Sequence, residues 1–202
     1  YAHFSRNGAL AWRLRVTKRF ESELSDLRRN VIEMGNLGAA MVSQAISFVS
    51  QPHNRGLPES ILKGEERMDH MQLEADREAI RLLAVYSPVA ANLRFVLSVC
   101  RITVALERMG DHAVNVCEFT QLWSSKADVA PLPQLQGMSQ VVMTMVTDAL
   151  QAFVQEDSRK ARIPIAHDDM VDSLNDQIIE DLLSPNTVKE MIHDRMNLAA
   201  AM

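Results

Sequence analysis

The sequence predicts an all-α protein made of two tandem, similar three-helix bundles, six helices in all. Leu, Ala, Met and Arg favour helices, whereas the helix breakers Gly and Pro number only seven each among 202 residues. Apolar residues recur every three or four positions over long segments, which is the periodicity of helices with one buried face. The order of motifs in the first half of the chain is repeated in the second half.

Three expected helices occupy the first half of the chain. A segment rich in Pro, Asn and Gly separates the first helix from the second. Ser87 offers an N-cap for the third helix, and Pro88 its first helical residue. We expect residues 18–123 to fold as one bundle, preceded by an N-terminal extension at residues 1–17. The expected helices span residues 18–49, 59–86 and 88–123.

The second half repeats this order after a linker at residues 124–133. Pro164 is expected to kink or interrupt the second of its helices. Ser-Pro at residues 184–185 then opens a last helix, as Ser-Pro does at residues 87–88. This helix stops before it could carry a second copy of the third-helix acidic motif, so we expect the second bundle, residues 134–202, to have a truncated last helix. The expected helices span residues 134–155, 158–183 and 185–202.

Charge and composition exclude several classes of protein. The net charge of −5 and dispersed basic residues argue against a nucleic-acid partner. No apolar run is long enough to span a membrane, so we expect no membrane-spanning helix. Cys100 and Cys117 lie about 25 Å apart along one expected helix, so they cannot bond to each other, and free thiols fit a reducing cytosol. The sequence leaves monomer and homodimer open.

Pairs of carboxylates spaced by four residues occur in three of the expected helices. This spacing places both side chains on one helix face, about one turn apart. Acids on an apolar face are costly unless their charge is compensated, and carboxylate oxygens suit hard metal ions. Two such helices side by side would direct four carboxylates to a common centre, although a solvated face is the ordinary explanation of a single pair. The pairs are Glu65 and Asp69, Glu107 and Asp111, and Asp168 and Asp172.

The residue pattern alone leaves three classes of function open. The acids could hold a structural metal ion, serve a carboxylate-bridged dimetal enzyme, or bind basic surfaces of partners in a metal-free helical adaptor. The enzyme would need several His ligands, and the sequence supplies only the Glu190-x-x-His193 element. No Gly-rich phosphate loop and no meaningfully spaced Ser-His-Asp arrangement is present, so no catalytic residue is assigned.

A specific motif string covers the end of the second expected helix and the third. Its elements are Leu83-Ala84, Pro88-Val89-Ala90, Asn92-Leu93-Arg94, Arg101 and Leu106-Glu-Arg-Met-Gly-Asp-His-Ala113. This string resembles the PhoU family of phosphate transport accessory and regulatory proteins, and the two-repeat layout agrees with it. The resemblance implies a fold of two similar three-helix bundles and a protein that is not an enzyme.

The resemblance also implies ligands and partners. Acidic motifs of the family bind iron, zinc, manganese or magnesium, and the family restrains phosphate uptake and the phosphate-starvation response when phosphate is plentiful. The implied partners are a sensor histidine kinase and the ATPase subunit of the phosphate ABC importer. The metal-binding positions that match are Glu65, Asp69, Glu107 and Asp111 in the first repeat, and Asp168 and Asp172 in the second.

Overall fold

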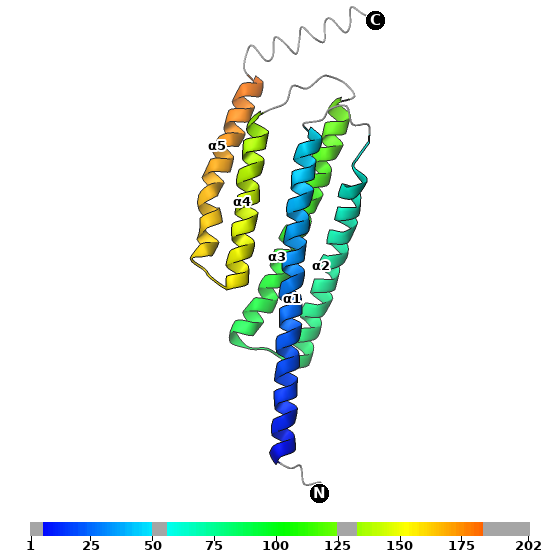
Figure 1. The fold of residues 1–202 in the computed structure, drawn as a ribbon, viewed down its shortest axis with the longest axis vertical. Coiled ribbons are helices and arrows are strands. Elements are labelled where there is room, and N and C mark those ends of the chain that lie inside the picture. Colours follow the sequence, from blue (N-terminus) through cyan, green and yellow to red (C-terminus); the bar gives the residue numbers. More distant parts are fainter. Residues whose placement is uncertain (1–5, 50–55, 125–132, 184–202) are drawn as a thin grey trace, which may run out of the picture. The chain divides into compact units, whose positions relative to one another are not determined.

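A computed structural model of the chain describes residues 6–49, 56–124 and 133–183, all of which lie in helices or their connections (Figure 1). The predicted all-α class is confirmed, and within these ranges there is no β-strand. The chain divides into two compact units, Tyr1–Ala127 and Asp128–Met202. The helices are α1 (Arg6–Val49), α2 (Glu59–Tyr86), α3 (Ala90–Ser124), α4 (Pro133–Gln155) and α5 (Ile163–Leu183), with a 3₁₀ turn, η1 (Lys160–Arg162), before α5.

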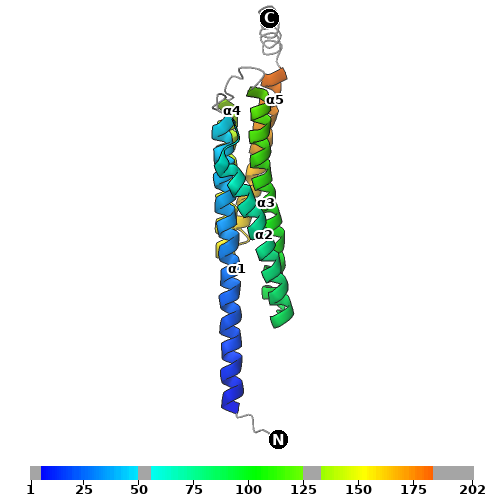
Figure 2. The same cartoon turned by 90° about the vertical axis from the view of Figure 1, so that its right-hand side faces the viewer.

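The first unit is a three-helix bundle in which α1, α2 and α3 each contact the other two. Figures 1 and 2 both show the three helices running alongside one another. The apolar side chains that recur every three or four residues form its core, and burying one such side chain contributes about 1.5–3 kcal/mol. The most completely buried are Leu27, Val31, Met34, Met41, Ile61, Met68, Leu82, Val96, Val99 and Cys117.

Helix α1 begins at Arg6, well before the expected start near Lys18. The segment from Gly8 to Arg15 contains Ala, Leu, Trp and Arg but no proline, so nothing in it stops a helix. Thr17 is a residue type that can cap a helix starting at Lys18, but without a helix breaker before it the helix continues through Thr17 toward the N-terminus.

The connection between α2 and α3 corrects the role predicted for Ser87. Ser87 ends α2 in a left-handed conformation (φ 45°), and its N–H donates to the Leu83 carbonyl at 3.1 Å. Pro88 disfavours a helical conformation in the residue before it, so α2 cannot continue through Ser87. Helix α3 then begins at Ala90, which is also left-handed (φ 51°). Ser87 is therefore a C-terminal residue of α2 and not the N-cap of α3.

In the second unit, α4 and α5 pack against each other as a helical hairpin. The single helix expected over residues 158–183 is divided into η1 and α5, and Pro164 lies in the first turn of α5, where its missing N–H costs little. Gln134 on α4 donates to the Asp181 carboxylate on α5 at 2.6 Å. The helix expected at residues 185–202 lies outside the described residues, and so does most of the linker.

Candidate metal centre

The tight turn between α2 and α3 makes these helices antiparallel, and three side-chain interactions define their register. Glu65 interacts with Asp111, Asp69 with Glu107, and Asp76 with Cys100. The step of seven residues from Asp69 to Asp76 along α2 is matched by a step of seven back along α3, from Glu107 to Cys100. A uniform register of this kind places the acidic pairs of the two helices opposite each other.

The two acidic pairs of the first half meet at one place on the bundle. One carboxylate oxygen from each of Glu65, Asp69 and Asp111 lies within 4.8 Å of the other two. Glu107 adjoins this group, since its carboxyl feels the charges of Asp111 and Asp69. We call these four residues the carboxylate cluster. Their role as metal ligands stays a prediction, whereas their convergence is a feature of the fold.

The carboxylate cluster holds negative charge that nearby cations do not balance. Burial raises the pKa of Glu65, and the charges of Asp69 and Asp111 raise it further. Burial likewise raises the pKa of Glu107, as do the charges of Asp111 and Asp69, and the charge of Arg108, which lowers this pKa, does not outweigh them. Within the described part of the chain, none of the four acids forms an ion pair with Lys or Arg. The site therefore favours a ligand that brings positive charge.

Other acids of the bundle are compensated, which sets the carboxylate cluster apart. Glu23 accepts a hydrogen bond from the Nε of Arg19 at 2.9 Å and forms an ion pair with a guanidinium nitrogen of Arg81 at 2.7 Å. Burial alone would raise the pKa of Glu23, but the hydrogen bonds from Arg81, Arg19 and Tyr86 outweigh burial and hold the pKa below its usual value.

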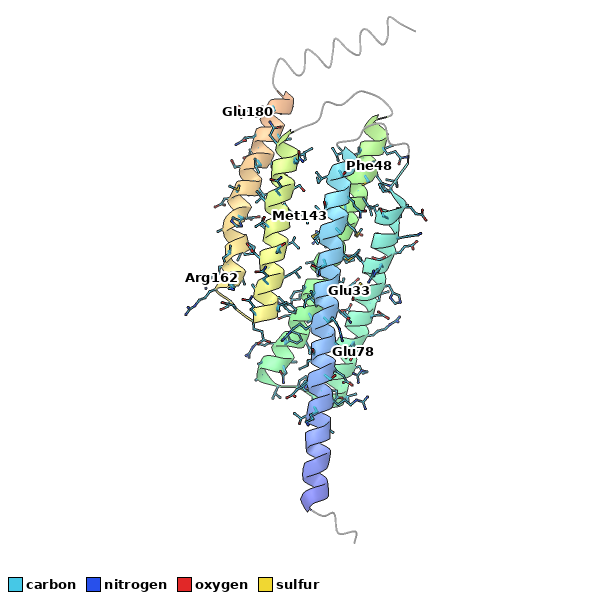
Figure 3. The ribbon with its side chains drawn as sticks, in the orientation of Figure 1. Glu33, Phe48, Glu78, Met143, Arg162 and Glu180 are labelled. Atoms are coloured by element: carbon cyan, nitrogen blue, oxygen red, sulfur yellow. The ribbon has the colours of Figure 1, made fainter. Side chains whose placement is uncertain are left out.

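Two further acids of the bundle, both labelled in Figure 3, also have arginine partners. Glu33 on α1 pairs with Arg67 on α2, and Glu78 pairs with Arg81 along α2. Arginine thus forms ion pairs with several carboxylates of this bundle, whereas Arg108, whose charge reaches the carboxylate cluster, forms no ion pair with it.

The acidic pair of the second half has a different setting. Asp168 and Asp172 lie on α5, and both are exposed. The structure brings no third acid, cysteine or histidine into a ligand group with them among the residues it describes. The helix that was expected to face them, at residues 185–202, lies outside the described residues. A second metal site therefore stays a prediction.

The antiparallel register also extends the polar face beyond the predicted site. Gln72 donates to the Asp76 carboxylate at 3.5 Å, and the thiol of Cys100 lies beside the same carboxylate. Burial raises the pKa of Cys100, and the charge of Asp76 raises it further. The pairing of Asp76 with Cys100 was not predicted from the sequence. The equal spacing of Asp76 from Asp69 and of Cys100 from Glu107 was the available clue.

The donor set of the carboxylate cluster fits a hard cation. All of its ligand atoms are carboxylate oxygens, which suit magnesium, manganese or iron better than soft-ligand metals. The group that the structure brings together contains no histidine, and Glu190 and His193 lie outside the described residues. The carboxylate-bridged dimetal enzyme therefore gains none of the histidine ligands it needs from the part of the chain that the structure describes.

Fold and site together define an all-α bundle protein with an uncompensated carboxylate cluster and no assigned catalytic residue. The PhoU domain matches residues 31–120 and 135–198. The chain therefore belongs to the PhoU domain family, which confirms the resemblance of the motif string. None of the described helices is both long and apolar enough to cross a membrane.

Relatives and solved structures agree with this assignment. The chain is 31% identical to a phosphate-specific transport system accessory protein PhoU homolog of Aquifex aeolicus, over 85% of this chain and 79% of that protein. A homolog of the same name from Clostridium acetobutylicum is 30% identical over 83% and 76% of the two chains. These proteins are named as accessory proteins, so the expectation of a non-enzymatic protein is confirmed.

Two crystal structures resemble the fold of this chain. PhoU from Pseudomonas aeruginosa superposes with a TM-score of 0.76 at 26% identity, covering 89% of this chain and 84% of that one. The phosphate transport system regulatory protein PhoU from Streptococcus pneumoniae gives a TM-score of 0.74 at 26% identity, over 81% and 77%. Both are similar to this chain along most of its length.

Proposed function

We propose that this chain is a cation-binding regulator of phosphate uptake and of the phosphate-starvation response. The observation that supports the phosphate role is the match to the PhoU domain over both halves of the chain. In this proposal the protein restrains the phosphate ABC importer and its sensor kinase when phosphate is plentiful. It does so in the cytoplasm, by contacting the ATPase subunit and the sensor histidine kinase, and it meets the membrane only through them.

The cation would be held by residues of two helices. Glu65 and Asp69 from α2 and Asp111 from α3 would supply oxygen ligands, and Glu107, which adjoins Asp111, would add a further ligand. A bound cation supplies positive charge that neutralises these carboxylates. Because the ligands come from both helices, they would hold α2 and α3 together and fix the surface that a partner meets.

The cation part of the proposal is tested by elemental analysis of protein purified without a metal-affinity step. The wild type is expected to carry iron, manganese, zinc or magnesium in a fixed ratio, and Glu107→Ala/Asp111→Ala to lose it. Glu118→Ala, at an exposed position of the same helix, is the matched control and should keep the metal. Unchanged metal content in the double variant would reject the assignment of these ligands.

The regulatory part is tested in a bacterium that lacks its own PhoU-family gene and carries a phosphate-starvation reporter. The wild-type chain is expected to repress the reporter in phosphate-rich medium and to co-purify with the ATPase subunit of the importer. Glu107→Ala/Asp111→Ala should repress poorly at equal protein level. Full derepression in cells that contain the folded wild-type chain would exclude the phosphate role, whatever the metal analysis shows.

A further inference from the structure

Buried glycines of three helices surround the core directly behind the carboxylate cluster. Gly38 lies on α1, Gly64 on α2 and Gly110 on α3, and all three are buried. Gly64 immediately precedes Glu65 in the sequence, and Gly110 immediately precedes Asp111. Glycine in a helix interior costs about 0.5–1 kcal/mol relative to alanine, so its use at three facing positions calls for a packing reason.

Methionine side chains fill the space that the glycines leave. A Cβ added at Gly64 would lie 2.9 Å from the Met41 sulfur and 3.0 Å from its Cγ. A Cβ at Gly110 would lie 3.4 Å from Cγ of Met68, which is ordinary contact, and one at Gly38 would overlap the terminal methyl of Met109. The six residues form one layer across the bundle: Gly38, Gly64 and Gly110 with Met41, Met68 and Met109.

Met41 has no room to move away from a Cβ added at Gly64. Met41 is only 1% exposed, so it has no solvent space to move into. A carbon at Gly64 would be about 0.6 Å closer to the sulfur than the 3.5 Å at which non-bonded atoms normally begin to fit. An added methyl group therefore pushes α2 away from α1, and Glu65 and Asp69 move with α2 relative to Asp111 on α3.

From this juxtaposition we infer that the glycine–methionine layer positions the carboxylates of α2 and α3 for cation binding. The inference rests on the proposed function, since it assigns supporting residues to the same site. The glycines and methionines do not touch the cation; they set how closely the helices that carry the ligands approach. Loss of a group that orients a metal ligand by a hydrogen bond weakens metal binding by about 10–100-fold, and we expect a shift of the ligand-bearing helix to weaken it at least as much as the lower end of that range.

The test measures Mn²⁺ affinity of the cation-free full chain by titration calorimetry. Gly64→Ala is expected to weaken Mn²⁺ binding about tenfold or more while circular dichroism shows a folded protein. Gly64→Ala/Met41→Val should recover affinity to within about threefold of wild type, because the pair adds one side-chain heavy atom and removes one. Gly137→Ala on α4 is the control and should bind as wild type does, since nothing lies within 4 Å of its added Cβ.

The outcomes separate this inference from the proposed function. Wild-type affinity in Gly64→Ala would overturn the inference, and so would weakened binding that Met41→Val does not restore. If wild type itself binds no Mn²⁺, the proposed cation site is wrong, and the inference falls with it. Should Gly64→Ala not fold, Gly38→Ala tests the same layer: weakened Mn²⁺ binding that Met109→Val restores would support the inference, and wild-type affinity would overturn it.

Discussion

Replacing Glu65 with Gln should stabilise the cation-free protein and weaken its response to cations. The substitution removes one charge from a group whose carboxylate oxygens lie within 4.8 Å of one another, and it keeps the size of the side chain. It also removes the cost of keeping a half-buried carboxylate ionised, which is the main reason that the pKa of Glu65 is raised. Both effects favour the folded state when no cation is bound.

The size of the gain follows from Coulomb's law. Two unit charges 4.8 Å apart repel by about 0.9 kcal/mol in water and by about 3.5 kcal/mol at an effective dielectric constant near 20. The site is only half-buried, so the lower end applies once solvent screening is included. We therefore expect Glu65→Gln to raise the unfolding free energy by about 1 kcal/mol, or the melting temperature by about 2–4 °C.

Urea unfolding in EDTA and in excess Mn²⁺ measures both effects. Glu65→Gln should be more stable than wild type in EDTA, and Mn²⁺ should stabilise it less, since ligand stabilisation scales with the logarithm of [L]/Kd. Glu118→Gln, at an exposed position of α3, should match wild type in both buffers. A Glu65→Gln protein that is less stable than wild type in EDTA would show that Glu65 is already compensated, and the electrostatic reasoning would be wrong.

Three further predictions follow from the pKa shifts. The folded-state pKa values of Glu65 and Glu107 lie above 4.5, so these ionised groups lower stability at neutral pH, and protonation relieves that cost as the pH falls toward 4.5. Urea unfolding of the cation-free protein should therefore show a rising unfolding free energy over this pH range. Mn²⁺ affinity measured by calorimetry should fall over the same range. Glu23→Gln should lower the unfolding free energy by about 1 kcal/mol at pH 7. Because the folded-state pKa of Glu23 lies below 4.5, the difference from wild type should shrink as the pH falls below 4.5 and vanish once Glu23 is protonated in the folded protein. Asp76→Asn removes a charge that raises the pKa of Cys100, so iodoacetamide should alkylate this thiol faster at pH 8. An unchanged rate would show that Asp76 does not influence the ionisation of Cys100.

The sequence predicts most strongly where local chemistry is decisive. Helix α2 begins and ends at the expected residues because Pro58 precedes it and the Ser87-Pro88 step stops it. The start of α1 was missed because a helix-favouring segment carries no boundary signal of its own. The same Ser-Pro pattern fits either a helix end or a helix start, and only the backbone conformation of Ser87 decides between them.

Convergence of the four acids was predictable, because each i, i+4 pair lies on one face of its helix and the two helices are antiparallel neighbours. The lack of ion pairs to these four acids was not predictable, since the long side chain of arginine can reach any of several neighbouring carboxylates. Arg81 reaches Glu23 on α1, and Arg67 reaches Glu33, although both arginines lie on the helix that carries Glu65. Partner choice of this kind depends on helix register and rotation, which periodicity alone does not determine.

The contrast between paired and unpaired acids is the strongest physical argument for a ligand. If the acids of α2 and α3 served only solubility, exposed faces would accommodate them at little cost. Instead four carboxylates converge at a half-buried position, behind which Gly64 and Met41 pack closely, while Glu23 and Glu33 have arginine partners elsewhere in the same bundle. The carboxylate cluster lowers the stability of the cation-free protein, and such an arrangement is expected at a site where a bound cation restores that stability. Comparing Glu65→Gln with wild type, with and without Mn²⁺, examines that expectation directly.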